Sequence, residues 1–138
     1  MQFKYKIAGG DFNAAGDAAS AVKKILKQLN VDPAISKRTV VALYEGEVNI
    51  VAHAWEGTIR VDIDPERIYI VLEDTGPGIP DIEKAMEEGF STASPKVREM
   101  GFGAGMGLPN IKKNTDHLDL TSEEGKGTRL EMTIYLNK

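Results

Sequence analysis

Apolar and polar residues alternate near the start of the chain, and the spacing becomes helical soon afterwards. The alternating stretch F-K-Y-K-I places Phe3, Tyr5 and Ile7 on one face, which predicts an initial strand at about Lys4 to Ala8. Apolar residues then recur every three or four positions from Asp11 to Leu29, which predicts a helix. A second helix is predicted from about Ile35 to Trp55, and its expected apolar stripe consists of Val41, Tyr44, Val48, Val51 and Trp55.

Alternation returns after Gly57, which is expected to break the second helix. Two strands, a short acidic helix, a further helix and a final hairpin follow in that order. Their predicted ranges are Thr58 to Asp64, Arg67 to Asp74, Asp81 to Gly89, Gly107 to Asn114, His117 to Ser122 and Thr128 to Leu136. Strands in adjacent pairs predict an α+β fold, a two-layer sandwich of helices packed on a mixed, largely antiparallel sheet.

The composition fits a single domain that covers residues 1–138, and it excludes several classes of protein. The chain weighs 15.0 kDa, with 41% hydrophobic and 28% charged residues, which is ordinary for a globular domain. It has no cysteine, so disulfides and thiolate metal sites are excluded. The net charge is −4, the basic residues are scattered, and no apolar run has the length of a membrane span. We therefore expect a cytoplasmic protein that binds neither nucleic acid nor a membrane.

Three polar residues of the second predicted helix lie four positions apart, namely Glu45, Asn49 and His53. This spacing places them along one flank of the apolar stripe. Carboxylate and amide oxygens suit Mg²⁺, so the flank is a candidate metal-binding surface. The alternative is a polar edge that only meets solvent, since polar pairs at this spacing are common on helices.

Asp74 ends an apolar strand and stands immediately before Gly76 and Gly78. A flat ligand can approach the backbone of a glycine loop closely. A carboxylate at this point is therefore placed to accept a hydrogen bond from an amine of such a ligand. The alternative is an aspartate that simply begins a turn, as aspartate often does.

Alternating glycines stand directly ahead of a predicted helix in G-F-G-A-G-M-G-L-P-N-I-K-K. Successive backbone N–H groups of such a loop, together with the N-terminus of the helix, form a concave anion site. Lys112 and Lys113 lie within the first two turns of this helix and add positive charge. A flexible linker is the alternative, but the run passes straight into the helix without polar spacing, so we favour phosphate binding.

Together these segments resemble the ATP-binding domain that gyrase, the Hsp90 chaperones, sensor histidine kinases and MutL share. E-G-E-V-N-I-V-A-H-A is similar to the N-box of that superfamily, and E-D-T-G-P-G-I-P is similar to its first glycine box. G-A-G-M-G-L and E-G-K-G-T are similar to the second and third glycine boxes. The resemblance implies a Bergerat-type ATP-binding fold that uses ATP and Mg²⁺.

The resemblance also implies a role for each matching residue. Glu45 matches the carboxylate that orients or deprotonates the acceptor hydroxyl, and Asn49 matches the ligand of Mg²⁺. Asp74 matches the residue that receives the adenine amino group, with support from Gly78 and Thr128. The remaining residues of the implied ATP site are the phosphate-embracing glycines Gly103, Gly105 and Gly107, together with His53, Gly76, Leu108, Lys112 and Gly127.

Within the superfamily, the chain is similar above all to the small anti-sigma serine/threonine kinases of bacterial partner-switching systems. The stretch E-D-T-G-P-G-I-P-D-I-E-K-A-M-E-E-G-F-S-T is especially similar to the stressosome switch kinase, which phosphorylates a STAS-domain partner. This likeness implies a STAS-domain anti-anti-sigma protein or a sigma factor as the partner, and it leaves homodimerisation open. The segment from about Phe90 to Gly103 is expected to form a lid over the phosphates.

The alternative function is a binding module that uses ATP to hold a sigma factor or another protein without phosphorylating it. Retention of Glu45 favours catalysis, because binding Mg-ATP requires Asn49 and the glycines but less obviously a base. An ATPase or a histidine kinase fragment is least expected, because no helix with a phosphoacceptor histidine precedes the domain.

Overall fold

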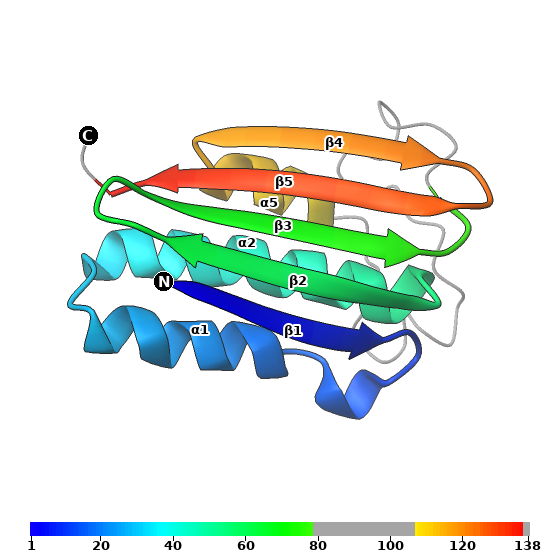
Figure 1. Cartoon of the computed structure of the whole chain (residues 1–138), viewed down its shortest axis with the longest axis horizontal. Coiled ribbons are helices and arrows are strands. Elements are labelled where there is room, and N and C mark those ends of the chain that lie inside the picture. The colour runs from blue at the N-terminus through cyan, green and yellow to red at the C-terminus, as the bar shows by residue number, and fades with distance from the viewer. Residues whose placement is uncertain (79–106, 137–138) are drawn as a thin grey trace.

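The computed structural model describes residues 1–78 and 107–136 of the chain. Figure 1 shows this part as two layers, with a sheet on one side and helices on the other. The elements are β1 (Gln2–Ala8), a 3₁₀ helix (Phe12–Ala14), α1 (Asp17–Gln28), α2 (Pro33–His53), β2 (Glu56–Ile63), β3 (Arg67–Thr75), α5 (Gly107–Asn114), β4 (His117–Glu123) and β5 (Gly127–Tyr135).

The five described strands form one sheet in the order β1-β2-β3-β5-β4. Each neighbouring pair is antiparallel, so the sheet has no parallel pair among the described strands. α1, α2 and α5 all cover the same face of this sheet (Figure 1). The prediction of an α+β sandwich of helices on a largely antiparallel sheet is confirmed.

The hydrophobic core lies between the sheet and the helices. Alternate residues of the strands face the helices and form the sheet side of this core. The strand register places three rows of buried side chains across the sheet, namely Ile59–Leu72–Leu130, Val61–Ile70–Met132 and Ile63–Ile68–Ile134. A shift of one residue in any of these strands would turn its row to the opposite face. Burial of these rows therefore fixes the register, and with it the positions of the strand ends.

Local backbone chemistry sets the ends of the first two helices. α1 begins at Asp17 rather than at Asp11 as predicted, because Gly16 adopts a left-handed conformation with φ of 97° that interrupts the helix. α2 begins at Pro33, which suits a first helical position because proline has no backbone N–H to leave unpaired. The carboxylate of Asp32 caps this helix by accepting a hydrogen bond of 2.8 Å from a backbone N–H in its first turn.

The buried face of α2 differs from the predicted apolar stripe. The prediction is wrong at Tyr44 and Trp55, whose side chains are 37% and 64% exposed. Contact with the sheet selects a different face, because a Cβ on Gly46 would lie only 2.7 Å from Cδ2 of Leu72. The residues buried on this face include Thr39, Ala42, Leu43, Gly46, Glu47 and Ile50.

α2 ends at His53, so the prediction that Gly57 breaks the helix is also wrong. Gly57 lies within β2, where a Cβ would approach a methyl carbon of Ile50 to 2.9 Å. The predicted helix from Asp81 to Gly89 and the expected lid lie outside the described residues and stay predictions. In the described part of the chain, no helix has the length and apolar character needed to span a membrane.

Candidate functional site

Two polar side chains of α2 converge on the first residue of α5. A Cβ placed on Gly107 would lie 3.1 Å from Oδ1 of Asn49 and 3.4 Å from Oε2 of Glu45. Both side chains are half-buried, and neither has a hydrogen-bond partner among the described residues. The absence of a side chain at Gly107 thus keeps two hard oxygen ligands beside the N-terminus of a helix, where the exposed backbone N–H groups favour an anion.

A second carboxylate of α2, which the sequence analysis missed, has a different role. Glu47 is fully buried, and its two carboxylate oxygens accept hydrogen bonds of 3.1 and 3.0 Å from the backbone N–H groups of Ala18 and Ala19. These groups belong to the first turn of α1, which has no partner of its own for them. Glu47 therefore caps α1 across the interface between the two helices. The signal for it in the sequence is a charged residue at a position of the helix that faces the core.

Asp74 lies near the end of β3 and is half-buried. Its Oδ1 accepts a hydrogen bond of 3.1 Å from the backbone N–H of Thr128, while its Oδ2 has no partner among the described residues. Burial raises the pKa of Asp74, and the hydrogen bond from Thr128 partly offsets this shift. The hydroxyl of Thr128 is itself held at 2.9 Å from that of Ser122. One oxygen of Asp74 is thus fixed by the sheet, and the other remains available as an acceptor.

The glycines around Asp74 allow backbone segments to pack closely against one another. A Cβ on Gly127 would lie 1.9 Å from the carbonyl oxygen of Asp74, and a Cβ on Gly78 would lie 2.5 Å from that of Glu123. Gly76 faces Cα of Ala54, at 3.0 Å from a Cβ built on it. A side chain at Gly76 or Gly78 would force the loop after β3 away from Ala54 or from the end of β4, and a side chain at Gly127 would push β5 away from the end of β3. These glycines therefore allow backbone segments to approach one another closely, and their predicted contact with ATP stays a prediction.

α2 joins the surroundings of Asp74 to the surroundings of Gly107. Just after its C-terminal end, the backbone N–H of Trp55 donates to the carbonyl of Thr75, the last residue of β3, at 2.8 Å. His53, in the last turn, is half-buried, and burial lowers the pKa of its imidazole. From His53 back to Glu45 the helix extends about 12 Å at 1.5 Å per residue. One wall of the site is therefore a single straight element.

The other predicted site residues are distributed unevenly. Leu108 is buried and packs in the core beneath the N-terminus of α5. Lys112 is exposed and lies in the last turn of α5, away from the end where the exposed N–H groups attract an anion. Gly103 and Gly105 lie outside the described residues, so their predicted role stays a prediction.

Comparison with known proteins shows the family to which the chain belongs. The sequence profile described as "Histidine kinase-, DNA gyrase B-, and HSP90-like ATPase" matches residues 35–138, which include the whole of the candidate site. The chain belongs to this ATPase family. Membership of this ATPase family implies that the chain uses ATP.

The curated relatives of the chain cover most of its length. It is 35% identical over 118 residues to the serine/threonine-protein kinase RsbT of Bacillus subtilis (strain 168), an alignment that covers 83% of each protein. It is 36% identical over 115 residues to an anti-sigma F factor of Caldanaerobacter subterraneus subsp. tengcongensis, which covers 78% of this chain and 77% of the relative. An anti-sigma F factor of Clostridium perfringens (strain SM101 / Type A) is 31% identical over 130 residues and 88% of each protein.

Proposed function

We propose that this chain is an ATP-dependent serine/threonine protein kinase and anti-sigma regulatory factor that phosphorylates a STAS-domain partner in the cytoplasm. The observation that carries the proposal is the convergence of Glu45 and Asn49 on Gly107 at the N-terminus of α5. Relatives of similar length named as a serine/threonine-protein kinase and as anti-sigma F factors support it.

In this proposal, the adenine base lies at the Asp74 end of the site and the triphosphate lies at the Gly107 end. The free Oδ2 of Asp74 accepts a hydrogen bond from the adenine amino group. The N-terminus of α5, with the preceding Gly103 and Gly105, holds the phosphates through backbone N–H groups. The distance of about 12 Å along α2 between these ends suits an extended nucleotide. The contributions of His53, Gly76, Leu108, Lys112, Gly127 and Thr128 to nucleotide binding remain part of the proposal.

Asn49 is the residue that would hold Mg²⁺. Its amide oxygen is a hard ligand beside the phosphate-binding helix end, and among the described residues no cluster of three acidic or histidine side chains could hold a metal ion alone. A magnesium ion that takes one protein oxygen and completes its shell with phosphate and water oxygens fits this donor set. When bound, the ion would neutralise charge on the triphosphate.

Glu45 is the proposed catalytic base. Its carboxylate orients the hydroxyl of the incoming serine or threonine and accepts the hydroxyl proton. The oxygen of the acceptor forms a bond to the γ-phosphorus while the bond from that phosphorus to the β–γ bridging oxygen breaks, and ADP leaves. Because such a transfer depends mainly on positioning and electrostatics, a base, a phosphate cradle and one metal ligand are sufficient protein machinery.

The anti-sigma F factor names of several relatives favour a second candidate, a module that binds ATP and restrains a sigma factor without phosphorylating anything. Retention of a half-buried Glu45 without a structural partner in the described part of the chain favours the kinase. A module that only binds Mg-ATP has no need of that carboxylate.

Calorimetry and phosphotransfer assays test the proposal together. Wild type should bind ATP more tightly with Mg²⁺ than without it, and Asn49→Ala should lose that gain. Wild type should also transfer labelled phosphate from ATP to a serine or threonine of a STAS-domain protein. If Asn49→Ala binds Mg-ATP as tightly as wild type, the metal ligand is assigned wrongly. If wild type phosphorylates no STAS-domain protein but binds a sigma factor in the presence of ATP, the binding module is the correct account.

A further inference from the structure

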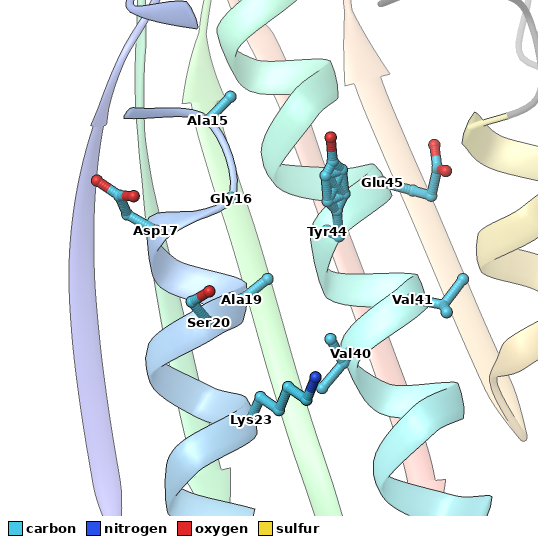
Figure 2. Close-up of a pocket in the computed structure, with 10 residues that line it drawn as sticks. All are labelled: Ala15, Gly16, Asp17, Ala19, Ser20, Lys23, Val40, Val41, Tyr44 and Glu45. Atoms are coloured by element: carbon cyan, nitrogen blue, oxygen red, sulfur yellow. The ribbon is translucent and has the colours of Figure 1, made fainter. Parts of the chain in front are cut away.

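A groove of about 460 Å³ runs between α1 and α2 and reaches Glu45 (Figure 2). Asp17, Ser20, Lys23 and Tyr44 are exposed among the residues that line it, so the groove opens to solvent. Its volume falls within the range of sites that bind ligands in other proteins. Six of the residues that line it are Ala19, Ser20, Lys23, Val40, Tyr44 and Glu45.

The groove has an apolar centre with Lys23 towards one end, and its other charged lining residue besides Glu45 is Asp17, whose carboxylate is directed away from α2 (Figure 2). Tyr44 stands between α1 and Glu45, and Glu45 directs its carboxylate to the side of α2 that faces α5 (Figure 2). Val40 lies one turn below Tyr44 on the same side, and both are accessible to solvent. Lys23 extends from α1 towards Val40, and no carboxylate pairs with its ammonium in the part of the chain that the structure describes. The groove therefore offers an apolar contact from Tyr44 and Val40 and a positive charge from Lys23, and it also reaches the proposed base, Glu45.

The walls of the groove are held rigidly. Glu47 joins α2 to the first turn of α1 through two buried hydrogen bonds, so the spacing between the helices is fixed where the groove begins. Gly16, just before that turn, has a left-handed backbone, and a Cβ on it would lie 3.9 Å from Cε1 of Tyr44. Because these contacts are already made, a ligand need not order the groove in order to bind there.

We propose that this groove binds the acceptor segment of the protein substrate and selects its sequence. The inference rests on the proposed kinase function. The occupant is an extended segment whose serine or threonine reaches Glu45, whose neighbouring apolar side chain contacts Tyr44 and Val40, and whose acidic side chain pairs with Lys23.

Two observations assign this occupant rather than another. Glu45 belongs both to the groove and to the phosphate end of the nucleotide site, so a chain lying in the groove brings a hydroxyl to the only point where the proposed base is found. The unpaired ammonium of Lys23 is complementary to an acidic residue, and a paired charge at such a position contributes to both affinity and specificity. A second copy of this chain or a small molecule in the groove would not have to contact Glu45 at all.

The test compares Lys23→Glu with Lys24→Glu in phosphorylation of a STAS-domain protein. Lys24 is the neighbouring exposed lysine and does not line the groove, so it controls for net charge. Lys23→Glu should raise KM for the protein substrate roughly tenfold or more while kcat and the Kd for ATP change little. Lys24→Glu should resemble wild type. Tyr44→Ala should also raise KM, and melting temperatures should show that all variants are folded.

Charge exchange gives the second measurement. Acidic residues near the phosphorylated position of the STAS-domain protein are replaced with lysine one at a time, and one of these changes should restore a low KM to Lys23→Glu. An unchanged KM in both Lys23→Glu and Tyr44→Ala would overturn the groove proposal, while loss of transfer in Glu45→Ala would leave the kinase function intact.

If wild type transfers no phosphate, the proposed function fails, and calorimetric binding of the same STAS-domain protein decides the groove by itself. Weaker binding by Lys23→Glu, but not by Lys24→Glu, supports the groove. Equal binding of the STAS-domain protein by the two variants, or no binding by wild type, overturns the groove proposal. A change in the oligomeric state of Lys23→Glu that accounts for all of its weaker binding also overturns it.

Discussion

Glu45 and Glu47 lie two positions apart on α2, yet their surroundings differ completely. Two positions correspond to about 200° around a helix, so the two carboxylates point to opposite flanks. Glu47 is fully buried, and both of its oxygens accept hydrogen bonds from α1. Glu45 is half-buried beside Gly107 and has no hydrogen-bond partner in the described residues. The comparison separates a carboxylate that completes the fold from one that no described residue engages, as the proposed catalytic role of Glu45 requires.

Asp74 is intermediate between these two. One of its oxygens is used by the backbone of Thr128 and the other has no partner among the described residues. Oδ2 of Asp74 is not among the side-chain atoms that are both buried and without a partner, so it is accessible to solvent and can accept a hydrogen bond from a ligand. The number of carboxylate oxygens with a hydrogen-bond partner among the described residues thus rises from none in Glu45 to one in Asp74 and two in Glu47. In the same order, removal of the carboxylate should affect activity less and the free energy of unfolding more.

The largest expected effect is on phosphoryl transfer in Glu45→Ala. A positioned general base contributes about 10²–10⁴-fold to rate, so kcat for transfer to the partner should fall by that factor. ATP affinity should be mostly kept, because the metal ligand and the phosphate cradle remain. Asn49→Ala should lose both. The measurement is single-turnover transfer together with calorimetry and a melting curve, with the exposed Glu56→Ala as control. A broadly lowered melting temperature in Glu45→Ala would show that this carboxylate is structural after all.

Glu47→Ala should instead unfold more easily. Two backbone N–H groups at the start of α1 would lose their acceptor within a buried interface, which should lower the free energy of unfolding by about 2–4 kcal/mol. Glu47→Gln keeps an amide oxygen that can accept one of the two bonds, so its loss should be smaller. Urea denaturation without nucleotide measures both. A Glu47→Ala protein as stable as wild type, with impaired kcat, would reverse the roles assigned to the two glutamates.

The sequence predicted the elements well wherever a single periodicity dominated. Strands β2 and β3 and the hairpin β4–β5 lie within a residue or two of their predicted positions, because alternate apolar side chains of each strand contribute to the core. α2 was predicted as a helix but with the wrong buried face. Its apolar residues surround much of the helix, and the close approach of Gly46 to Leu72 shows which face meets the sheet.

For the site, spacing along one helix was sufficient to group Glu45 with Asn49, since residues four apart must be neighbours. Their convergence on Gly107 depends on the packing of α5, which no local pattern contains. Glu47 was overlooked because its partners are backbone groups of another helix. Several glycines that were assigned to ligand contact also lie close to other backbone segments, because close approach requires glycine whether the neighbour is a ligand or a turn.

The raised pKa of Asp74 makes both the stability of the protein and its affinity for ATP depend on pH. Burial raises the pKa of Asp74, so the folded protein keeps a proton that the unfolded chain releases between the ordinary pKa and the raised one. The free energy of unfolding should therefore fall as pH rises through this window, and Asp74→Asn should remove that part of the slope. ATP affinity should change in the opposite direction and weaken as pH is lowered through the raised pKa, because a protonated carboxyl is a poorer acceptor.

The same residue should distinguish ATP from GTP. Guanine has a carbonyl oxygen where adenine has its amino group, so Oδ2 of Asp74 would face another acceptor. A hydrogen bond to a charged group contributes about 1.5–3 kcal/mol, which corresponds to a preference of about tenfold or more. Asp74→Asn should abolish the preference or the binding, whereas Glu73→Gln, an exposed neighbour, should not. Equal affinity of wild type for ATP and GTP would refute the role.

The smallest effect is expected at the N-terminal half of α2, where Arg38 donates to Oδ1 of Asp116 at 3.1 Å. Oδ2 of Asp116 also accepts a bond of 2.8 Å, from the backbone N–H of Tyr135, so this carboxylate resembles Glu47 in having both oxygens engaged. The pair is more exposed than Glu47, with 28% and 12% of the two side chains accessible, and solvent weakens it. Arg38→Ala should therefore lower the free energy of unfolding by only about 1 kcal/mol, as measured by urea denaturation, and should leave kcat unchanged. A loss of kcat as large as that of Glu45→Ala would mean that the whole length of α2, rather than the segment near Gly107, sets the geometry of transfer.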